Sequence, residues 1–323
     1  MDSAIISEKN IAKNKKITSH ILSGLFRYGM LLIIGYIVLY PLLLMLSSAF
    51  KSEDALFDAA FVWFPKTLSM EWVKQAYEIM DFPKALGRTL SLQIVSSFIE
   101  IFTCSLIAYG FARFNFKGKK IASFILVLTL MIPISMYGMS LSINFRNVDF
   151  LGIFGLLNKL TGIDLRFNIF NTNWTLWLPS MLGVGIRSGM IIYIYIQFFS
   201  GLPAELEEAA YVDGAGPLKT YFKIALPSSS VVIMTVTVLS FIWHWNESYL
   251  SSVCFLENNQ PLSVIMANFN AKLMQIGMML ENNPRAEPIV FGACLLFIVI
   301  PLVLYLILQR KFVKSIDRVG ITG

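Results

Sequence analysis

The sequence predicts an all-α membrane protein with six transmembrane helices. Hydrophobic residues make up 56% of the chain and charged residues only 14%, against about 25% charged residues in a typical soluble domain. Six apolar segments are each close to the length of about twenty residues that a spanning helix needs. The net charge of +6 needs no nucleic acid to explain it, because basic residues gather at the cytoplasmic ends of spans.

The chain begins with a basic tail over 1–27, which we expect to be flexible and cytoplasmic. The first predicted span covers 28–49, and Pro41 is expected to kink it. No small-residue cleavage site follows, so this segment is interpreted as an anchor and not as a removed signal peptide. After an outer segment over 50–85, the second span is predicted at 89–111.

The remaining spans are predicted at 121–139, 174–199, 228–245 and 288–308. Pro133 interrupts the third span, and the glycines of the fourth favour either close helix packing or a bent helix. Between the third and fourth spans we expect a long irregular outer loop over 140–173, and residues 246–287 form another outer segment. The predicted transmembrane domain is therefore 28–308, and a short basic tail covers 309–323.

The distribution of basic residues predicts the orientation. Lys and Arg are more numerous in the two tails, the turn around Arg113–Lys120 and the loop over 200–227 than in the other three loops. The side richer in Lys and Arg is normally cytoplasmic. Both termini and the 200–227 loop are therefore expected in the cytoplasm.

The loop over 200–227 is polar but patterned. Pro203 suits a first helical turn, and the acids Glu205, Glu207 and Glu208 lie near the positive end of the resulting helix. Gly214 is a natural helix stop because glycine accepts a left-handed conformation. The sequence predicts a helix, a glycine turn and a second short helix over 218–225, which ends before Pro227. An ordinary amphipathic connector remains the alternative.

The same loop resembles the signature loop of bacterial ABC importer permeases of the carbohydrate, maltose-transporter type. The resemblance rests on Glu208-Ala209-Ala210-Tyr211-Val212-Asp213-Gly214-Ala215, followed by Ile224-Ala225-Leu226-Pro227. Matching motifs elsewhere are Ser48-Ala49-Phe50-Lys51, Ala108-Tyr109-Gly110-Phe111-Ala112-Arg113-Phe114 and Gln309-Arg310-Lys311-Phe312-Val313. Gly87-Arg88-Thr89 and the length of 144–173 depart from the family pattern.

The resemblance implies a type I importer permease fold whose coupling helix docks on a cytoplasmic ATPase. The implied partners are a second permease, two ATPase subunits that carry ATP and Mg²⁺, and an extracytoplasmic sugar-binding protein, all at a bacterial cytoplasmic membrane. The residues expected to couple to the ATPase are Glu208, Ala209, Ala210, Asp213, Gly214, Leu226 and Pro227. Nothing in the sequence names the sugar.

Two charges fall near the middle of predicted spans, Glu100 and Arg187. A charge at that depth costs at least about 2.5–3.5 kcal/mol, so each should face the bundle interior and have a partner. The two residues either pair with each other or a partner subunit, or line the transport path. Asn246 and Glu247 follow the fifth span and are either path residues or a solvated helix end.

The chain offers no catalytic constellation, no metal-binding motif and no phosphate-binding glycine loop. His244 lies between two tryptophans and is interpreted as an interfacial residue, and the three cysteines as small buried hydrophobes. The energy for active transport must then come from a partner or from an ion gradient. An ion-driven secondary transporter is the main alternative, although no internal repeat supports it. A membrane-embedded enzyme is a third and weaker one.

Overall fold

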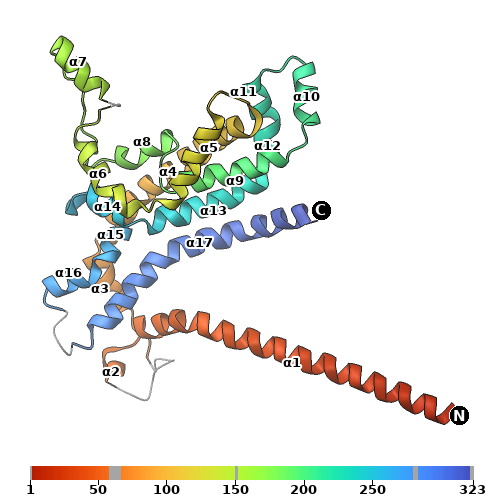
Figure 1. Cartoon of the computed structure of the whole chain (residues 1–323). Helices are drawn as coiled ribbons and strands as arrows, with labels where there is room; N and C mark the ends of the chain where they lie inside the picture. Colours follow the sequence, from red (N-terminus) through yellow and green to blue (C-terminus); the bar gives the residue numbers. More distant parts are fainter. Residues whose placement is uncertain (1, 58–66, 150–151, 279–282, 321–323) are drawn as a thin grey trace. The chain divides into compact units, whose positions relative to one another are not determined.

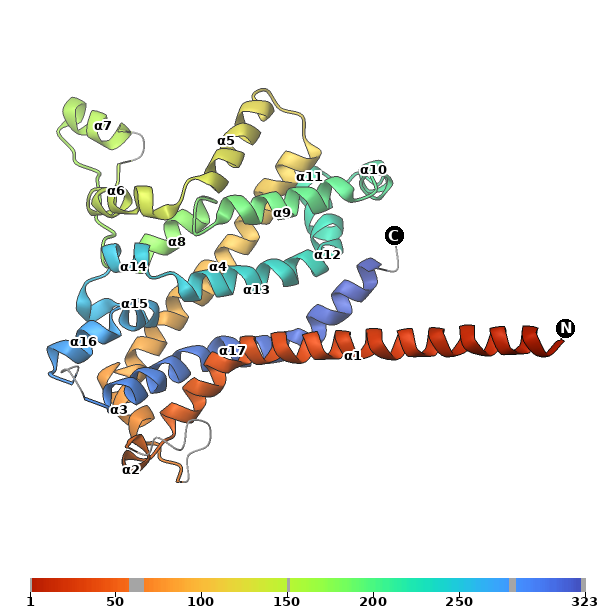
Figure 2. The ribbon, with the colours of Figure 1, turned by 60° about the horizontal axis from the view of Figure 1, so that its bottom comes forward.

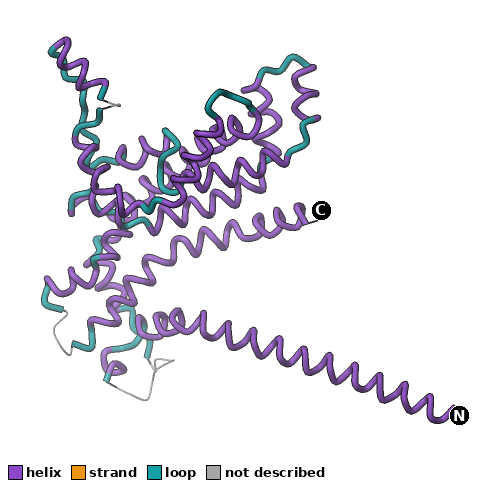
Figure 3. Tube along the Cα trace, in the orientation of Figure 1, coloured by secondary structure: helices purple, strands orange, loops and turns teal. Residues whose placement is uncertain are grey.

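The computed structural model describes residues 2–57, 67–149, 152–278 and 283–320, with side chains from residue 21 to residue 309 of these ranges. Over this part the chain is made of helices and loops (Figure 3). Its only β-type pairings there are two isolated bridges, Lys51 with Leu68 and Val148 with Phe167. The chain divides into two compact units, Met1–Ala76 with Leu280–Leu295, and Tyr77–Met279 with Leu296–Gly323. We describe each unit by itself.

The first unit contains α1 (Asp2–Ala49), α2 (Glu53–Leu56), most of α3 (Glu71–Ile79) and the first turns of α17 (Ala286–Gly320). Its core lies where α17 meets α3. Trp72 is fully buried and its indole nitrogen donates a hydrogen bond to the Lys51 carbonyl at 2.6 Å. A Cβ at Gly292 would lie 3.0 Å from the Trp72 carbonyl oxygen, so glycine allows the two backbones to approach closely.

The second unit is organised around α4 (Phe82–Arg113), which packs against α8 (Trp174–Met181), α9 (Ser188–Gly201) and α13 (Ser230–Asn246). Figures 1 and 2 show α9 and α13 running side by side with α4 across them. The buried core here includes Tyr109, Tyr195, Phe199 and Tyr221. This unit also contains α5 (Lys119–Met131), α6 (Ile134–Arg146), α7 (Ile153–Thr161) and the rest of α17.

Between α9 and α13 the chain forms α10 (Glu205–Val212), α11 (Pro217–Thr220), a π-helical turn (Tyr221–Ala225) and α12 (Leu226–Ser228). We call residues 202–229 the α10–α12 segment. After α13 come the short helices α14 (Tyr249–Cys254), the 3-10 turn Glu257–Asn259, α15 (Leu262–Ala267) and α16 (Phe269–Gln275).

Length and composition identify the spanning helices. Within the described residues, three stretches could cross a membrane, Ile21–Ala49, Phe82–Arg113 and Ala286–Gln309. Three pairs of helices bent at a break pass the same criteria together, which brings the number to as many as six. The all-α membrane fold is thus confirmed, and six spans agree with it.

Several details differ from the sequence-based expectations. The basic tail continues α1 as helix from Asp2, and the 140–173 loop contains the regular helix α7. The span predicted over 174–199 is two helices, α8 and α9, separated at 182–187, where Gly183 and Arg187 have positive φ values of 71° and 57°. As predicted, the chain breaks at Pro133, where α5 and α6 meet at 103°.

Candidate functional site

The α10–α12 segment has the first helix and the glycine turn that its sequence predicts. Its second helical stretch does not end before Pro227 as expected, because α12 contains Pro227. α10 ends at Val212, and Gly214 has φ 75°. The Gly214 and Ala215 amides donate to the Tyr211 and Ala210 carbonyls at 3.0 and 2.9 Å, which closes the helix end. A Cβ at Gly214 would meet nothing within 4 Å. Backbone conformation, and not space, is therefore the reason for glycine at this position.

One face of α10 is anchored to the end of α4. Glu207 and Ala210 are buried. The Glu207 carboxylate accepts a hydrogen bond from Arg113 Nε at 2.9 Å and a longer one, 3.4 Å, from the Tyr109 hydroxyl. Arg113 Nη2 also donates to the Leu202 carbonyl at 2.8 Å. The side chains of Arg113 and Glu207 are only 14% and 8% exposed, so this ion pair is mostly shielded from water.

The second half of the segment is anchored to the same helix. Tyr221 is fully buried, and its hydroxyl lies 2.5 Å from the Ser105 hydroxyl. Its ring also packs against Tyr109, with ring centroids 5.2 Å apart. The π-helical turn begins at Tyr221, and such turns are rare and frequent at functional sites.

The other face of α10 is exposed. Glu208, Ala209, Asp213 and Gly214 lie on it, as a docking surface requires, and Pro227 is exposed as well. Ala210 is buried and Leu226 half-buried, so these two predicted residues support the segment from inside. Large apolar side chains that the sequence reasoning did not single out complete the exposed surface: Leu206, Tyr211, Val212, Leu218 and Phe222.

The sequence reasoning also did not predict that Glu207 and Arg113 form an ion pair. Helical spacing gives a partial signal, because Glu207 and Ala210 are three residues apart and share one face. Glu208 then faces the other way. The identity of the partner, 94 positions earlier in the chain, could not be read from the sequence.

Glu100 lies in a buried polar cluster between three helices. Its carboxylate accepts hydrogen bonds from the hydroxyls of Ser188 at 2.5 Å and Ser240 at 3.0 Å, and His244 Nδ1 lies 3.6 Å away. His244 Nδ1 is also 2.9 Å from the Ser240 carbonyl, which can only accept, so this nitrogen carries the proton. The His244 side chain is fully buried within the described chain.

Arg187 lies elsewhere. It is exposed, adopts a left-handed backbone conformation before α9, and places its guanidinium 5.2 Å from the centre of the Trp243 ring. In the described part of the chain no ion pair joins it to Glu100. The partners of Glu100 are two serines and a histidine.

Asn246 and Glu247 differ from one another. Asn246 is exposed and donates to the Ile242 carbonyl at 2.9 Å. Glu247 is buried and accepts hydrogen bonds from the Leu250 amide at 2.7 Å and from the Ser251 amide at 3.0 Å. Its carboxylate therefore caps the first turn of α14, which is a structural role.

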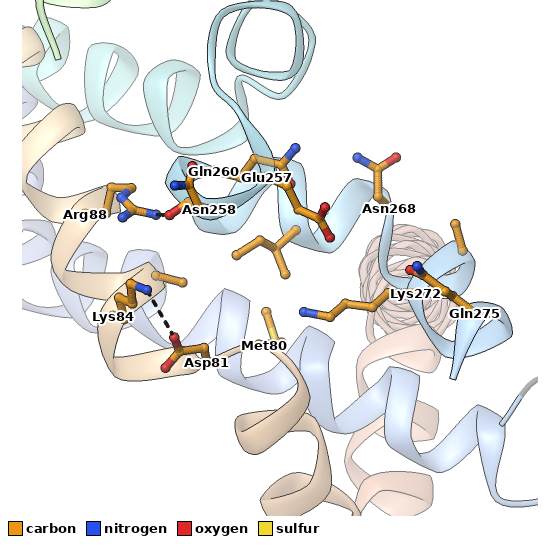
Figure 4. A pocket seen from close by; sticks show the side chains of 13 residues that line it. Met80, Asp81, Lys84, Arg88, Glu257, Asn258, Gln260, Asn268, Lys272 and Gln275 are labelled. Atoms are coloured by element: carbon orange, nitrogen blue, oxygen red, sulfur yellow. Dashed lines mark hydrogen bonds and ion pairs between the residues drawn. The ribbon is translucent and has the colours of Figure 1, made fainter. Parts of the chain in front are cut away.

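A polar pocket of about 390 Å³ lies beside the start of α4 (Figure 4). Lys84 pairs with Asp81 at 3.9 Å, and Arg88 donates to the Asn258 carbonyl at 2.7 Å. Lys272 extends into the pocket from α16. Among the described residues, no group of three or more His, Cys, Asp or Glu could hold a metal ion.

The helices long and apolar enough to cross a membrane define the class, a multi-pass membrane protein. The family model described as "Binding-protein-dependent transport system inner membrane component" matches residues 101–318, more than half of the chain. The chain belongs to this family. It is a multi-pass permease of the plasma membrane, a transport component and not an enzyme, and it works with binding-protein and ATPase components.

Known relatives match along most of their length. The polygalacturonan/rhamnogalacturonan transport system permease protein YtcP of Bacillus subtilis is 24% identical over 89% of this chain and 94% of its own. The galactooligosaccharides transport system permease protein GanQ of the same organism is 24% identical over 93% and 95%. The sn-glycerol-3-phosphate transport system permease protein UgpE of Yersinia pestis is 24% identical over 90% and 95%.

A solved structure shares the fold. It belongs to a bacterial ABC transporter involved in the import of the acidic polysaccharide alginate, and its matching chain superposes with a TM-score of 0.67 at 19% identity. The match covers 91% of this chain and 97% of the other.

Proposed function

We propose that this permease translocates a sugar or oligosaccharide that an extracytoplasmic binding protein delivers to it. The support comes from its relatives, because the systems named for YtcP and GanQ carry carbohydrates and the one named for UgpE carries a polyol phosphate. In the complete transporter it pairs with a second, homologous permease and two ATPase subunits, which hold ATP and Mg²⁺. Both termini and the α10–α12 segment lie on the cytoplasmic side.

The α10–α12 segment is the contact for an ATPase subunit. One observation carries this proposal: α10 presents an exposed acidic and apolar face while its opposite face is fixed to α4 by Glu207. Val212 is 87% exposed and Leu218 64%. Apolar side chains so exposed outside the membrane indicate a surface that another protein covers.

Co-purification tests this contact. We expect Val212→Asp to release the ATPase subunits from the solubilised complex, because it places a charge in the centre of an apolar contact. Leu160→Asp is the matched control, since Leu160 on α7 is 74% exposed but remote in sequence from the segment. An ATPase that stays bound to the Val212→Asp variant would contradict the proposal.

Uptake experiments test the substrate and the energy source. Liposomes that contain the assembled transporter should accumulate a labelled sugar when ATP is supplied, and collapse of the proton gradient should leave this uptake unchanged. Uptake that follows the proton gradient and ignores ATP would favour an ion-driven transporter instead.

A further inference from the structure

The cytoplasmic end of α4 holds the α10–α12 segment at two separate places. Ser105, Tyr109 and Arg113 are spaced four residues apart, so they lie on one face of α4. Ser105 contacts Tyr221, after the Gly214 turn, whereas Arg113 contacts Glu207 and Leu202, before it. α4 thus forms hydrogen bonds with the segment on both sides of the Gly214 turn.

Arg113 makes the shorter contacts before the turn, and Tyr109 adds a longer hydrogen bond of 3.4 Å to Glu207. Arg113 uses two different nitrogens, Nε toward the Glu207 carboxylate and Nη2 toward the Leu202 carbonyl. Only the planar guanidinium presents donors in this fixed fork, and lysine cannot reproduce it. The pair is mostly shielded from solvent, where charge-assisted hydrogen bonds are stronger and less screened by salt.

The same helix leads to the buried cluster deeper in the membrane. Glu100 lies 13 residues before Arg113 on α4, which is about 20 Å along an unbroken helix. Through Glu100, α4 is hydrogen-bonded to Ser188 on α9 and to Ser240 on α13. A displacement of Arg113 along the axis therefore reaches the contacts between three spanning helices.

We propose that Arg113 is the positioning residue that makes α10 and α4 move as one body, so that movement of the ATPase is transmitted to the spans and not absorbed by the loop. This inference rests on the proposed contact between α10 and an ATPase. It adds to that contact a defined route into the membrane, from α10 through the Glu207–Arg113 ion pair to α4.

The test compares substrate uptake with ATP hydrolysis in the complete transporter reconstituted in liposomes. Arg113→Gln and Glu207→Gln are expected to lower the uptake per ATP hydrolysed by about tenfold, a typical size for coupling between two sites, while the ATPase subunits stay bound. The exchange Arg113→Glu with Glu207→Arg should restore most of this ratio, because it re-forms the ion pair. Arg113→Lys should be intermediate and is the fallback if Arg113→Gln does not accumulate.

Lys117→Gln and Glu78→Gln are the matched controls. Both residues are exposed, carry the same charges as the pair and lie outside the α10–α12 segment, so the ratio should not change. An unchanged ratio in Arg113→Gln, or a charge exchange as defective as the single variants, would overturn the inference.

The experiments distinguish failure of this inference from failure of the proposed function. Loss of the ATPase subunits from Arg113→Gln would make the pair part of the docking surface, which overturns the inference but leaves the proposed function intact. Retention of the ATPase by Val212→Asp would instead remove the contact on which the inference is built.

Discussion

Removal of the Glu100 carboxyl should destabilise the second unit because two buried hydroxyls lose their hydrogen-bond acceptor. Ser188 and Ser240 both donate to Glu100, and all three side chains are at most 1% exposed. A buried polar group that loses its partner costs about 1–3 kcal/mol. Glu100→Ala strands two such groups, so we expect a loss of about 4 kcal/mol, to which the unfilled space adds.

Glu100→Gln separates this effect from the effect of charge. Glutamine keeps the shape and one acceptor oxygen, and its amide can donate to a serine hydroxyl, since a hydroxyl accepts as well as donates. Removal of a buried carboxylate also relieves a desolvation cost. We therefore expect Glu100→Gln to stay within about 1 kcal/mol of the wild type, because the lost charge-assisted bonds and the relieved desolvation oppose each other.

Thermal unfolding in detergent, followed by tryptophan fluorescence, measures the difference. With about 2–4 °C per kcal/mol for a unit of this size, Glu100→Ala should lower Tm by about 10 °C and Glu100→Gln by no more than about 4 °C. Glu78→Ala on α3 is the control, because Glu78 is exposed and its side chain has no hydrogen bond to another described residue. Equal Tm values for Glu100→Ala and Glu78→Ala would refute the reasoning.

Two further predictions concern packing and capping, and both are checked by Tm. Gly292→Ala should destabilise the first unit by about 1–3 kcal/mol, since its Cβ would lie 3.0 Å from backbone atoms of Trp72 and Val73. Gly110→Ala is the control. It should be neutral or stabilising by up to about 1 kcal/mol, because nothing lies within 4 Å of its Cβ. Glu247→Ala should cost about 1–2 kcal/mol through the lost cap of α14, and Asn246→Ala, at an exposed position, should change stability by less than about 0.5 kcal/mol. A Gly292→Ala protein as stable as Gly110→Ala, or equal effects at 246 and 247, would contradict these estimates.

Hydropathy and turn chemistry were enough to predict most of the apolar spans and the first helix and turn of the α10–α12 segment. Spans follow from runs of apolar residues, and the turn of the α10–α12 segment follows from Gly214, whose φ of 75° suits glycine. The sequence carried only an ambiguous signal for the break in the predicted fourth span. Its glycines allowed either a bend or close packing, and the structure has both, since a Cβ at Gly189 would lie 2.4 Å from Thr129 Oγ1 on α5.

Side-chain partners could not be predicted in the same way. Because an isolated charge near mid-membrane is costly, the sequence suggested that Glu100 and Arg187 pair with each other or with a partner subunit, or line the transport path. Arg187 instead lies just before the start of α9, in a left-handed backbone conformation. The hydroxyls of Ser188, the next residue, and of Ser240 on α13 donate to Glu100. Serine hydroxyls can donate hydrogen bonds to a buried carboxyl, but nothing in the sequence marks which serine will do so.

The contrast between α4 and its neighbours explains why one helix can connect distant parts of the second unit. The chain bends by 103° between α5 and α6 and is interrupted between α8 and α9, whereas α4 is unbroken from Phe82 to Arg113, about 48 Å at 1.5 Å per residue. Arg88 near its start lines the pocket, Glu100 joins it to α9 and α13, and Arg113 at its end holds α10. A bend would dissipate an axial displacement as rotation, but an unbroken helix conveys it along its whole length. The polar contacts at Glu100 and Arg113 therefore lie on one unbroken helix, and the proposed coupling predicts that a change at either residue alters the contacts of the other.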